Sequence, residues 1–193
     1  MDLTEKHYQD EDFAEVDLAA AAIDGVGFVG CDFSGASLAG ARTVRTSFEN
    51  CRFVGAEMYG SVHRATSFLN CTFDRAAWHG ASLTGCRLTG STFTRCRLTP
   101  LTLTECDLTL VSLAGERLAG VDLSGLRLRE ANLTGTNLAG CDLRGADLAG
   151  ARVVGADLVG ERVAAGRGAG REHDDQEHKC SRSDGPPAHD ASH

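Results

Sequence analysis

A large apolar residue recurs at every fifth position of the chain from Tyr8 to Val163. Of the 32 positions in this phase, only Thr43 and His63 break the pattern. An amphipathic helix repeats its apolar face about every 3.6 residues and a half-buried strand about every second residue, so neither explains a spacing of five. The pattern instead predicts a chain that turns a corner after every five residues.

Glycine marks the predicted corners. In residues 1–163, 18 of the 19 glycines occupy positions divisible by five, two residues after the apolar position. Glycine at this fixed offset supplies the positive φ that a tight corner requires, and Asn50 and Asn70, in the same phase, also tolerate that geometry. Two residues before each apolar residue the chain prefers Ala, Ser, Thr, Val or Cys, which indicates a second inward-pointing position where space is short.

One group of corners departs from the glycine pattern. Pro100 occupies a glycine position but cannot adopt a positive φ. Arg95, Glu105 and Leu110 also replace glycine nearby. We therefore expect the turn type to change within residues 94–113.

The phenylalanines indicate how many corners close one coil. All eight fall into two classes twenty residues apart: Phe13, Phe33, Phe53, Phe73 and Phe93 in one, and Phe28, Phe48 and Phe68 in the other. Four five-residue sides therefore form one coil, and residues twenty apart stack at the strand spacing of about 4.8 Å. The predicted fold is all-β, a four-sided solenoid of about eight coils over residues 1–165. The polar composition of residues 166–193 predicts a disordered tail.

Seven of the eight cysteines occupy the small inward position, which indicates core residues: Cys31, Cys51, Cys71, Cys86, Cys96, Cys106 and Cys141. Cβ atoms stacked at strand spacing lie beyond the usual disulfide separation, and no C-x-x-C spacing occurs. We expect reduced thiols, no metal site, no cofactor and a cytoplasmic location. Weak metal chelation is the less favoured interpretation of the tail, by His173, Asp174, Glu177, His178 and Cys180.

The sequence gives no support for catalysis. It contains no G-x-S-x-G motif and no P-loop, and His63 has no carboxylate or cysteine at a catalytic offset. We interpret Thr43 and His63 as a locally bulged corner with a structural role. The formal net charge of −8 disfavours direct binding to nucleic acid and favours basic partners. No run of roughly 18 apolar residues predicts a membrane span.

The segments ANLTG, TNLAG, CDLRG, ADLAG and ADLVG resemble the units of pentapeptide repeat proteins. The resemblance extends from Phe13 to about Val163. Within the family, SVHRATSFLNCTFDR (residues 61–75) and CRLTPLTLTECDLTL (residues 96–110) are most similar to the MfpA/Qnr-type fluoroquinolone-resistance proteins. This resemblance implies a right-handed quadrilateral β-helix.

The resemblance also implies a function and an assembly. Proteins of the MfpA/Qnr type resemble B-form DNA in surface, bind DNA gyrase, a type II topoisomerase, and form head-to-head homodimers. A rod of about eight coils is roughly 38 Å long, which matches about eleven base pairs. The resemblance therefore implies a non-catalytic DNA mimic that inhibits gyrase or protects it from fluoroquinolone-type inhibitors. Unlike MfpA-like chains, this sequence has a polar tail where those chains carry an apolar helical segment, so dimerisation through the last coil is a separate hypothesis.

The acidic residues are unevenly distributed. Residues 1–40 carry nine acids and one base, residues 41–100 three acids and eight bases, and residues 101–163 nine acids and six bases. We assign the gyrase-binding surface to acids of the C-terminal half, nearest the expected dimer axis: Glu105, Asp107, Asp122, Asp142, Asp147 and Asp157. The N-terminal cluster is the rival surface: Asp10, Glu11, Asp12, Glu15 and Asp17.

Two other classes of function stay open at this point. The chain could be a self-resistance or drug-sequestering protein of an antibiotic producer, or a structural repeat scaffold for another protein partner. A gene located beside antibiotic biosynthetic genes would favour the self-resistance or drug-sequestering protein. A gyrase supercoiling assay with and without fluoroquinolone would separate both from the DNA mimic.

Overall fold

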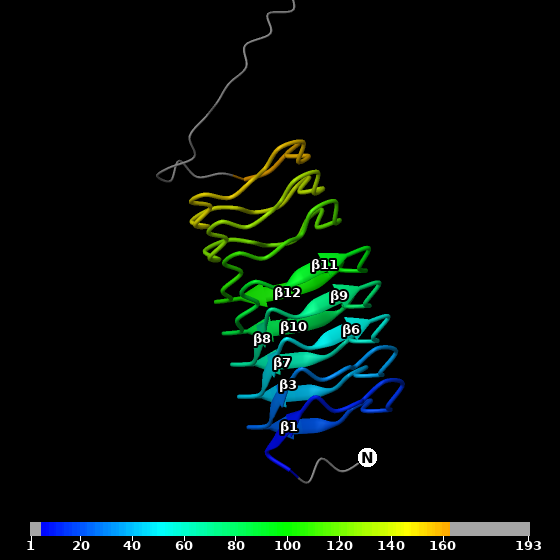
Figure 1. The fold of residues 1–193 in the computed structure, drawn as a ribbon. Helices are drawn as coiled ribbons and strands as arrows, with labels where there is room; N and C mark the ends of the chain where they lie inside the picture. Colours follow the sequence, from blue (N-terminus) through cyan, green and yellow to red (C-terminus); the bar gives the residue numbers. More distant parts are fainter. Residues whose placement is uncertain (1–4, 163–193) are drawn as a thin grey trace, which may run out of the picture.

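A computed structural model describes residues 5–162 of the chain. The predicted boundary between the solenoid and the tail, at residue 165, lies outside the described residues. The same holds for Val163 and for the tail itself. The described chain is a parallel β-solenoid whose coils stack from the N-terminal to the C-terminal end (Figure 1). No helix among residues 5–162 is long and apolar enough to cross a membrane.

Three parallel sheets form three sides of the solenoid, in the orders β1-β3-β5-β8, β12-β10-β7-β4-β2 and β11-β9-β6. Their strands are short: β1 (His7–Gln9), β2 (Ala22–Asp24), β3 (Gly27–Val29), β4 (Arg42–Val44), β5 (Ser47–Glu49), β6 (Arg52–Val54), β7 (Val62–Arg64), β8 (Ser67–Leu69), β9 (Thr72–Asp74), β10 (Ala81–Thr84), β11 (Thr92–Thr94) and β12 (Leu101–Thr104). Strands stay short because a corner follows every five residues.

The pairing confirms the predicted repeat of twenty. Phe48 of β5 pairs with Phe68 of β8, and Phe53 of β6 pairs with Phe73 of β9. The longest sheet stacks five strands. Beyond Thr104, isolated parallel bridges rather than strands continue the same repeat as far as Arg162.

The two predicted aromatic ladders form the core of the first coils. Phe33 and Phe53 stack with ring centroids 5.0 Å apart, as do Phe48 and Phe68. Rings of neighbouring ladders meet edge-on, with the centroids of Phe48 and Phe53 5.5 Å apart. The side chains of these four residues are fully buried. Leucines replace the aromatic rings in later coils and continue the apolar interior.

The corners confirm the glycine pattern and correct one prediction. Asn50 adopts a positive φ of 55°, in agreement with its phase. Arg95, Glu105 and Leu110 adopt φ values of 54°, 55° and 60°, so the predicted change of turn type at these three positions was wrong. A regular left-handed corner therefore tolerates other side chains, at a strain that the surrounding coils offset. Of these four corner residues, Pro100 is the one that does not have a positive φ, and its peptide bond with Thr99 is cis.

Thr43 and His63 do not form the bulged corner that we expected. They lie in the middle of β4 and β7, pair in regular parallel register, and are fully buried. The Thr43 hydroxyl lies 2.7 Å from His63 Nδ1, and the Ser61 hydroxyl lies 2.9 Å from Nε2. Because both ring nitrogens have partners, the imidazole fits inside the coil without distorting the backbone.

The cysteines of residues 5–162 are free thiols, as predicted, and all but Cys96 are fully buried. The Cys31 thiol lies 3.6 Å from the Tyr8 carbonyl oxygen of the preceding coil. Burial raises the pKa of Cys31, and it raises the pKa of Cys96 to about 11. These two thiols are therefore protonated near neutral pH. Residues 5–162 contain no group of three or more His, Cys, Asp or Glu side chains that could hold a metal ion.

Candidate partner-binding surface

The four sides of the solenoid provide four outer faces. We name three faces after their sheets: the β8 face, the β9 face and the β10 face. The fourth, the strandless face, begins with residues 16–20 and lies between the β9 and β10 faces. Each outward position is repeated twenty residues later on the same face, so charges on a face form columns along the rod.

The six candidate acids do not form one surface. Asp107 and Asp147 extend the β8 face, where both pair with Arg127 in one column. Asp122 and Asp142 pair with each other on the β10 face. The remaining two candidates are Glu105, at the corner that follows β12, and Asp157, on the strandless face.

Arginines partly neutralise three of these acids. The ion pairs join Asp142 to Arg144, Asp147 to Arg129 at 3.1 Å, and Asp107 to Arg127 at 3.6 Å. Hydrogen bonds from Arg144 lower the pKa of Asp142 to about 2. The carboxylates are thus ionised, but each lies beside a positive charge, which reduces the negative potential that a partner would meet.

The column on the β8 face shows the same compensation over a longer distance. Arg87, Asp107, Arg127 and Asp147 pair in succession, so positive and negative charges alternate along it. A strand of phosphates carries one sign of charge throughout. This column therefore differs from DNA in its charge pattern. The spacing of its charged residues follows from the repeat of twenty.

The N-terminal acids are less compensated. All five members of the cluster are exposed, and none forms an ion pair within residues 5–162. The carboxylates of Asp12 and Asp17 accept hydrogen bonds from the Ala14 and Ala19 N–H groups, which stabilise the corners. This end of the rod carries the more uniform negative charge.

Sequence reasoning missed one carboxylate, that of Glu116. It occupies the inward position that small residues fill in most coils, and it is only 4% exposed. Its Oε2 accepts a hydrogen bond of 3.1 Å from the Cys96 N–H group of the preceding coil. Burial raises its pKa. The signal was available, because an acid two residues before Leu118 breaks the small-residue phase.

The comparisons with known proteins agree with this architecture. Residues 31–61, 65–99, 102–138 and 127–160 match the family described as pentapeptide repeats, in 8 copies. The search of curated protein sequences found no match.

Among solved structures, trypsin-treated QnrB1, a plasmid-mediated fluoroquinolone resistance protein, is 20% identical, with a TM-score of 0.66 over 82% of this chain and 90% of that chain. Full-length QnrB1 is 18% identical, with a TM-score of 0.57 over 82% of this chain and 94% of that chain. HetL, a pentapeptide repeat protein involved in heterocyst differentiation regulation from the cyanobacterium Nostoc, is 18% identical and covers 85% of this chain and 94% of its own, with a TM-score of 0.34. The family match extends over more than half of the chain and accords with the right-handed quadrilateral β-helix. This chain belongs to the pentapeptide repeat family.

Proposed function

We propose that this protein is a non-catalytic mimic of duplex DNA that binds DNA gyrase or a related type II topoisomerase. Binding inhibits the enzyme or protects it from fluoroquinolone-type inhibitors. The observation that carries the proposal is the rigid four-sided rod with outward acids in fixed columns. A basic groove that normally holds DNA would attract such a rod electrostatically. The likeness in fold to QnrB1, a fluoroquinolone resistance protein, supports this choice of partner.

Two acidic surfaces are candidates for the contact with gyrase. We propose the C-terminal acids, because they lie nearest the end through which we propose that the chain dimerises. Asp122, like Glu105 and Asp157, forms no ion pair with an arginine within residues 5–162, so its carboxylate is available to a basic partner. Hydrogen bonds from Ser124 lower the pKa of Asp122, so this carboxylate is charged at neutral pH. The N-terminal cluster is the alternative, because its charge is less compensated.

Charge reversal tests the proposed surface. We expect the triple substitution of Asp122, Asp142 and Asp147 by Lys to abolish gyrase binding and the effect on supercoiling, because basic side chains would face a basic groove. The measurements are gyrase binding by calorimetry and a supercoiling assay with and without a fluoroquinolone. Binding of the unsubstituted protein should also weaken between about 50 and 200 mM salt, as phosphate contacts do.

The matched control reverses the same number of acids at the other end. The triple substitution of Asp10, Asp12 and Asp17 by Lys should leave binding intact, and circular dichroism should show that both variants remain folded. If only the N-terminal variant loses binding, the enzyme contact lies at that end and the proposed surface is wrong. Binding that survives both reversals and does not respond to salt would overturn the DNA mimic and favour a scaffold with another partner.

A further inference from the structure

The stack of coils is interrupted at one level. On the strandless face, the Leu118 N–H group donates to the Asn137 carbonyl oxygen at 2.8 Å, as in a regular coil. The equivalent bond from Leu98 to Arg117 is missing from the backbone hydrogen bonds of residues 5–162. Two successive coils are therefore not joined through their backbones at this position.

The interruption continues around the corner onto the β10 face. Strand β12 pairs with β10 along all four of its residues. On its other side, no backbone pairing joins Thr102 of β12 to Asp122 within the described chain, whereas Asp122 pairs with Asp142 of the coil beyond. Leu101 and Leu103 are consequently only half-buried, although they occupy inward positions. We call this interruption, between residues 96–104 and 116–124, the coil split.

The residues at the corner explain the split. The Gly60 N–H group donates to the His79 carbonyl oxygen, but the Gly80 N–H group donates to that of Pro100 at 2.6 Å, so the pairing is shifted by one residue. Because Pro100 has no N–H group, it cannot donate a backbone hydrogen bond to the next coil. In the next coil, the larger Glu116 side chain fills a position that small residues occupy in most coils, and its carboxylate accepts a hydrogen bond from the Cys96 N–H group.

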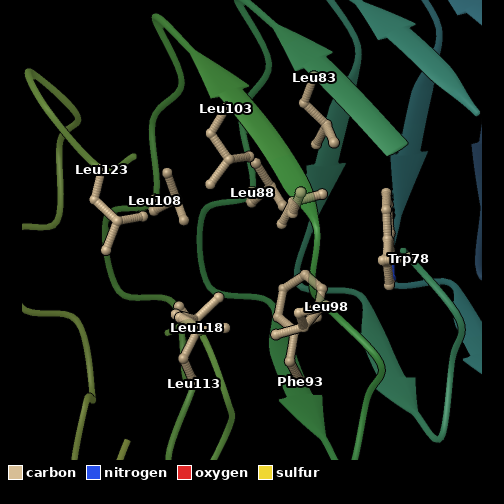
Figure 2. A pocket seen from close by; sticks show the side chains of 11 residues that line it. Trp78, Leu83, Leu88, Phe93, Leu98, Leu103, Leu108, Leu113, Leu118 and Leu123 are labelled. Carbon is tan, nitrogen blue, oxygen red and sulfur yellow. The ribbon is translucent and has the colours of Figure 1, made fainter. Parts of the chain in front are cut away.

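Three hollows meet at the split. A surface groove of about 450 Å³ is lined by His79, Arg97, Leu98, Thr99, Pro100 and Arg117, among others. A second hollow on the far side of Pro100 includes Leu101 and Asp122. Behind both lies an apolar interior lined by Trp78 and leucines, among them Leu98 (Figure 2). Leu101 also lines this interior. Leu98 and Leu101 thus belong both to the outer hollows and to the apolar interior. A groove of this size is in the range of sites that hold small molecules.

The groove has an unbalanced positive charge. Arg97 and Arg117 are exposed, and neither forms an ion pair within residues 5–162. The carboxylate of Glu116 is turned inward onto the Cys96 N–H group. Asp122 lines the second hollow and not the groove. The groove, which is lined by the two arginines, therefore favours an anion. Guanidinium groups bind carboxylates with paired hydrogen bonds.

We propose that the coil split is a binding site for a small organic carboxylate with an apolar body. The carboxylate lies between Arg97 and Arg117, and the apolar body packs on the exposed Pro100 and the half-buried Leu101. The site depends on both parts of the ligand, because the two arginines supply charge, and Pro100 and Leu101 supply apolar surface. This proposal does not rest on an interaction with gyrase.

Octanoate is a suitable probe because it combines a carboxylate with an apolar chain. Acetate keeps the charge without the chain, and octanamide keeps the chain without the charge. Trp78 is the sole tryptophan of the protein and lines the apolar interior, so its fluorescence reports on the site. We expect octanoate to change this fluorescence with a Kd of about 1 mM or lower, and acetate and octanamide to bind at least about tenfold more weakly. Calorimetry provides an independent measurement.

Paired substitutions test the two arginines. The double variant Arg97→Gln and Arg117→Gln should bind octanoate at least about tenfold more weakly, a loss of about 1.4 kcal/mol. The matched control, Arg52→Gln and Arg152→Gln, removes two exposed arginines from the regular coils of the β9 face and should bind as the unsubstituted protein does. Equal binding by both double variants, octanamide binding as tightly as octanoate, or no response to about 10 mM octanoate would overturn the proposal.

Discussion

The buried histidine shows how one polar residue is accommodated in an apolar ladder. The Ser61 hydroxyl donates to the Met58 carbonyl oxygen at 2.6 Å, so it accepts the hydrogen bond from His63 Nε2–H. Nδ1 then carries the lone pair and accepts from the Thr43 hydroxyl. The Thr66 hydroxyl lies 2.7 Å from that of Thr43 and 3.3 Å from the Arg64 carbonyl oxygen. These roles assign a neutral imidazole with its proton on Nε2. Thr43 and His63 were recognised from the sequence as breaks in the apolar phase, but this chain of partners depends on three sides of the coil.

Stability should depend on pH through His63. Burial lowers its pKa from 6.5 to about 3 in the folded protein. Between these values the unfolded chain binds more protons, so the free energy of unfolding should fall as the pH falls, by up to about 1.4 kcal/mol per pH unit. The stabilisation is complete above the unfolded pKa. We expect His63→Leu to remove most of this slope in urea titrations between about pH 5.5 and 6.5, which is above the ordinary pKa values of Asp and Glu.

The control for this prediction is an exposed histidine. His7→Gln removes an imidazole from the exposed edge of β1 and should leave the slope unchanged. A slope that is the same in the His63→Leu variant and in the unsubstituted protein would show that the imidazole is not the titrating group.

Among the elements, the strands and corners could be predicted from the sequence because each is specified locally. Within residues 5–162 every corner except that of Pro100 has its own left-handed residue, and every side except those of Thr43 and His63 has its own large apolar residue. The repeat of five therefore gives the sides, and the phenylalanines give the coil. The split could not be predicted in this way, because it needs Pro100 and Glu116, which lie in consecutive coils. The sequence located the irregular segment at residues 94–113 but attributed it to turn type instead of lost pairing between coils.

Amide hydrogen exchange tests the split directly. The Leu118 N–H group is bonded to the next coil, whereas the Leu98 N–H group has no backbone partner within the described chain, although both side chains are buried. We expect the Leu98 and Arg117 amides to exchange at least about tenfold faster than the Leu118 amide, because exchange at the first two needs no opening of a backbone hydrogen bond. Equal protection at Leu98 and Leu118 would mean that the coils are joined there.

In the whole molecule, the candidate site was harder to predict than the fold. The sequence gives the number of acids in each segment, but the potential depends on which bases lie beside them. Asp107 and Arg127 are twenty residues apart, so their contact follows from the repeat, whereas the pairing of Asp147 with Arg129 joins positions eighteen residues apart and depends on side-chain reach. Shape is specified by the repeat, and charge compensation by the side chains that differ between repeats.

The C-terminal end of the described rod carries the features expected of an interface. Val154 and Val159 are 75% and 76% exposed on outward positions. The carbonyl oxygens of both accept hydrogen bonds from the Gly135 and Gly140 N–H groups of the preceding coil, which fixes the two valines in the last described coil. Exposed apolar side chains in a rigid array favour association. We propose a two-fold dimer through this end.

Sedimentation velocity tests the dimer. We expect the unsubstituted protein at micromolar concentration to sediment with twice the chain mass of 20.3 kDa. The double variant Val154→Lys and Val159→Lys should sediment as a monomer, because two charges would have to be buried in the interface. Val29→Lys, which alters an outward valine of β3 near the other end, is the control and should remain dimeric. A monomeric unsubstituted protein would remove the dimer, and with it the reason for placing the gyrase contact at the C-terminal acids rather than at the less compensated N-terminal cluster.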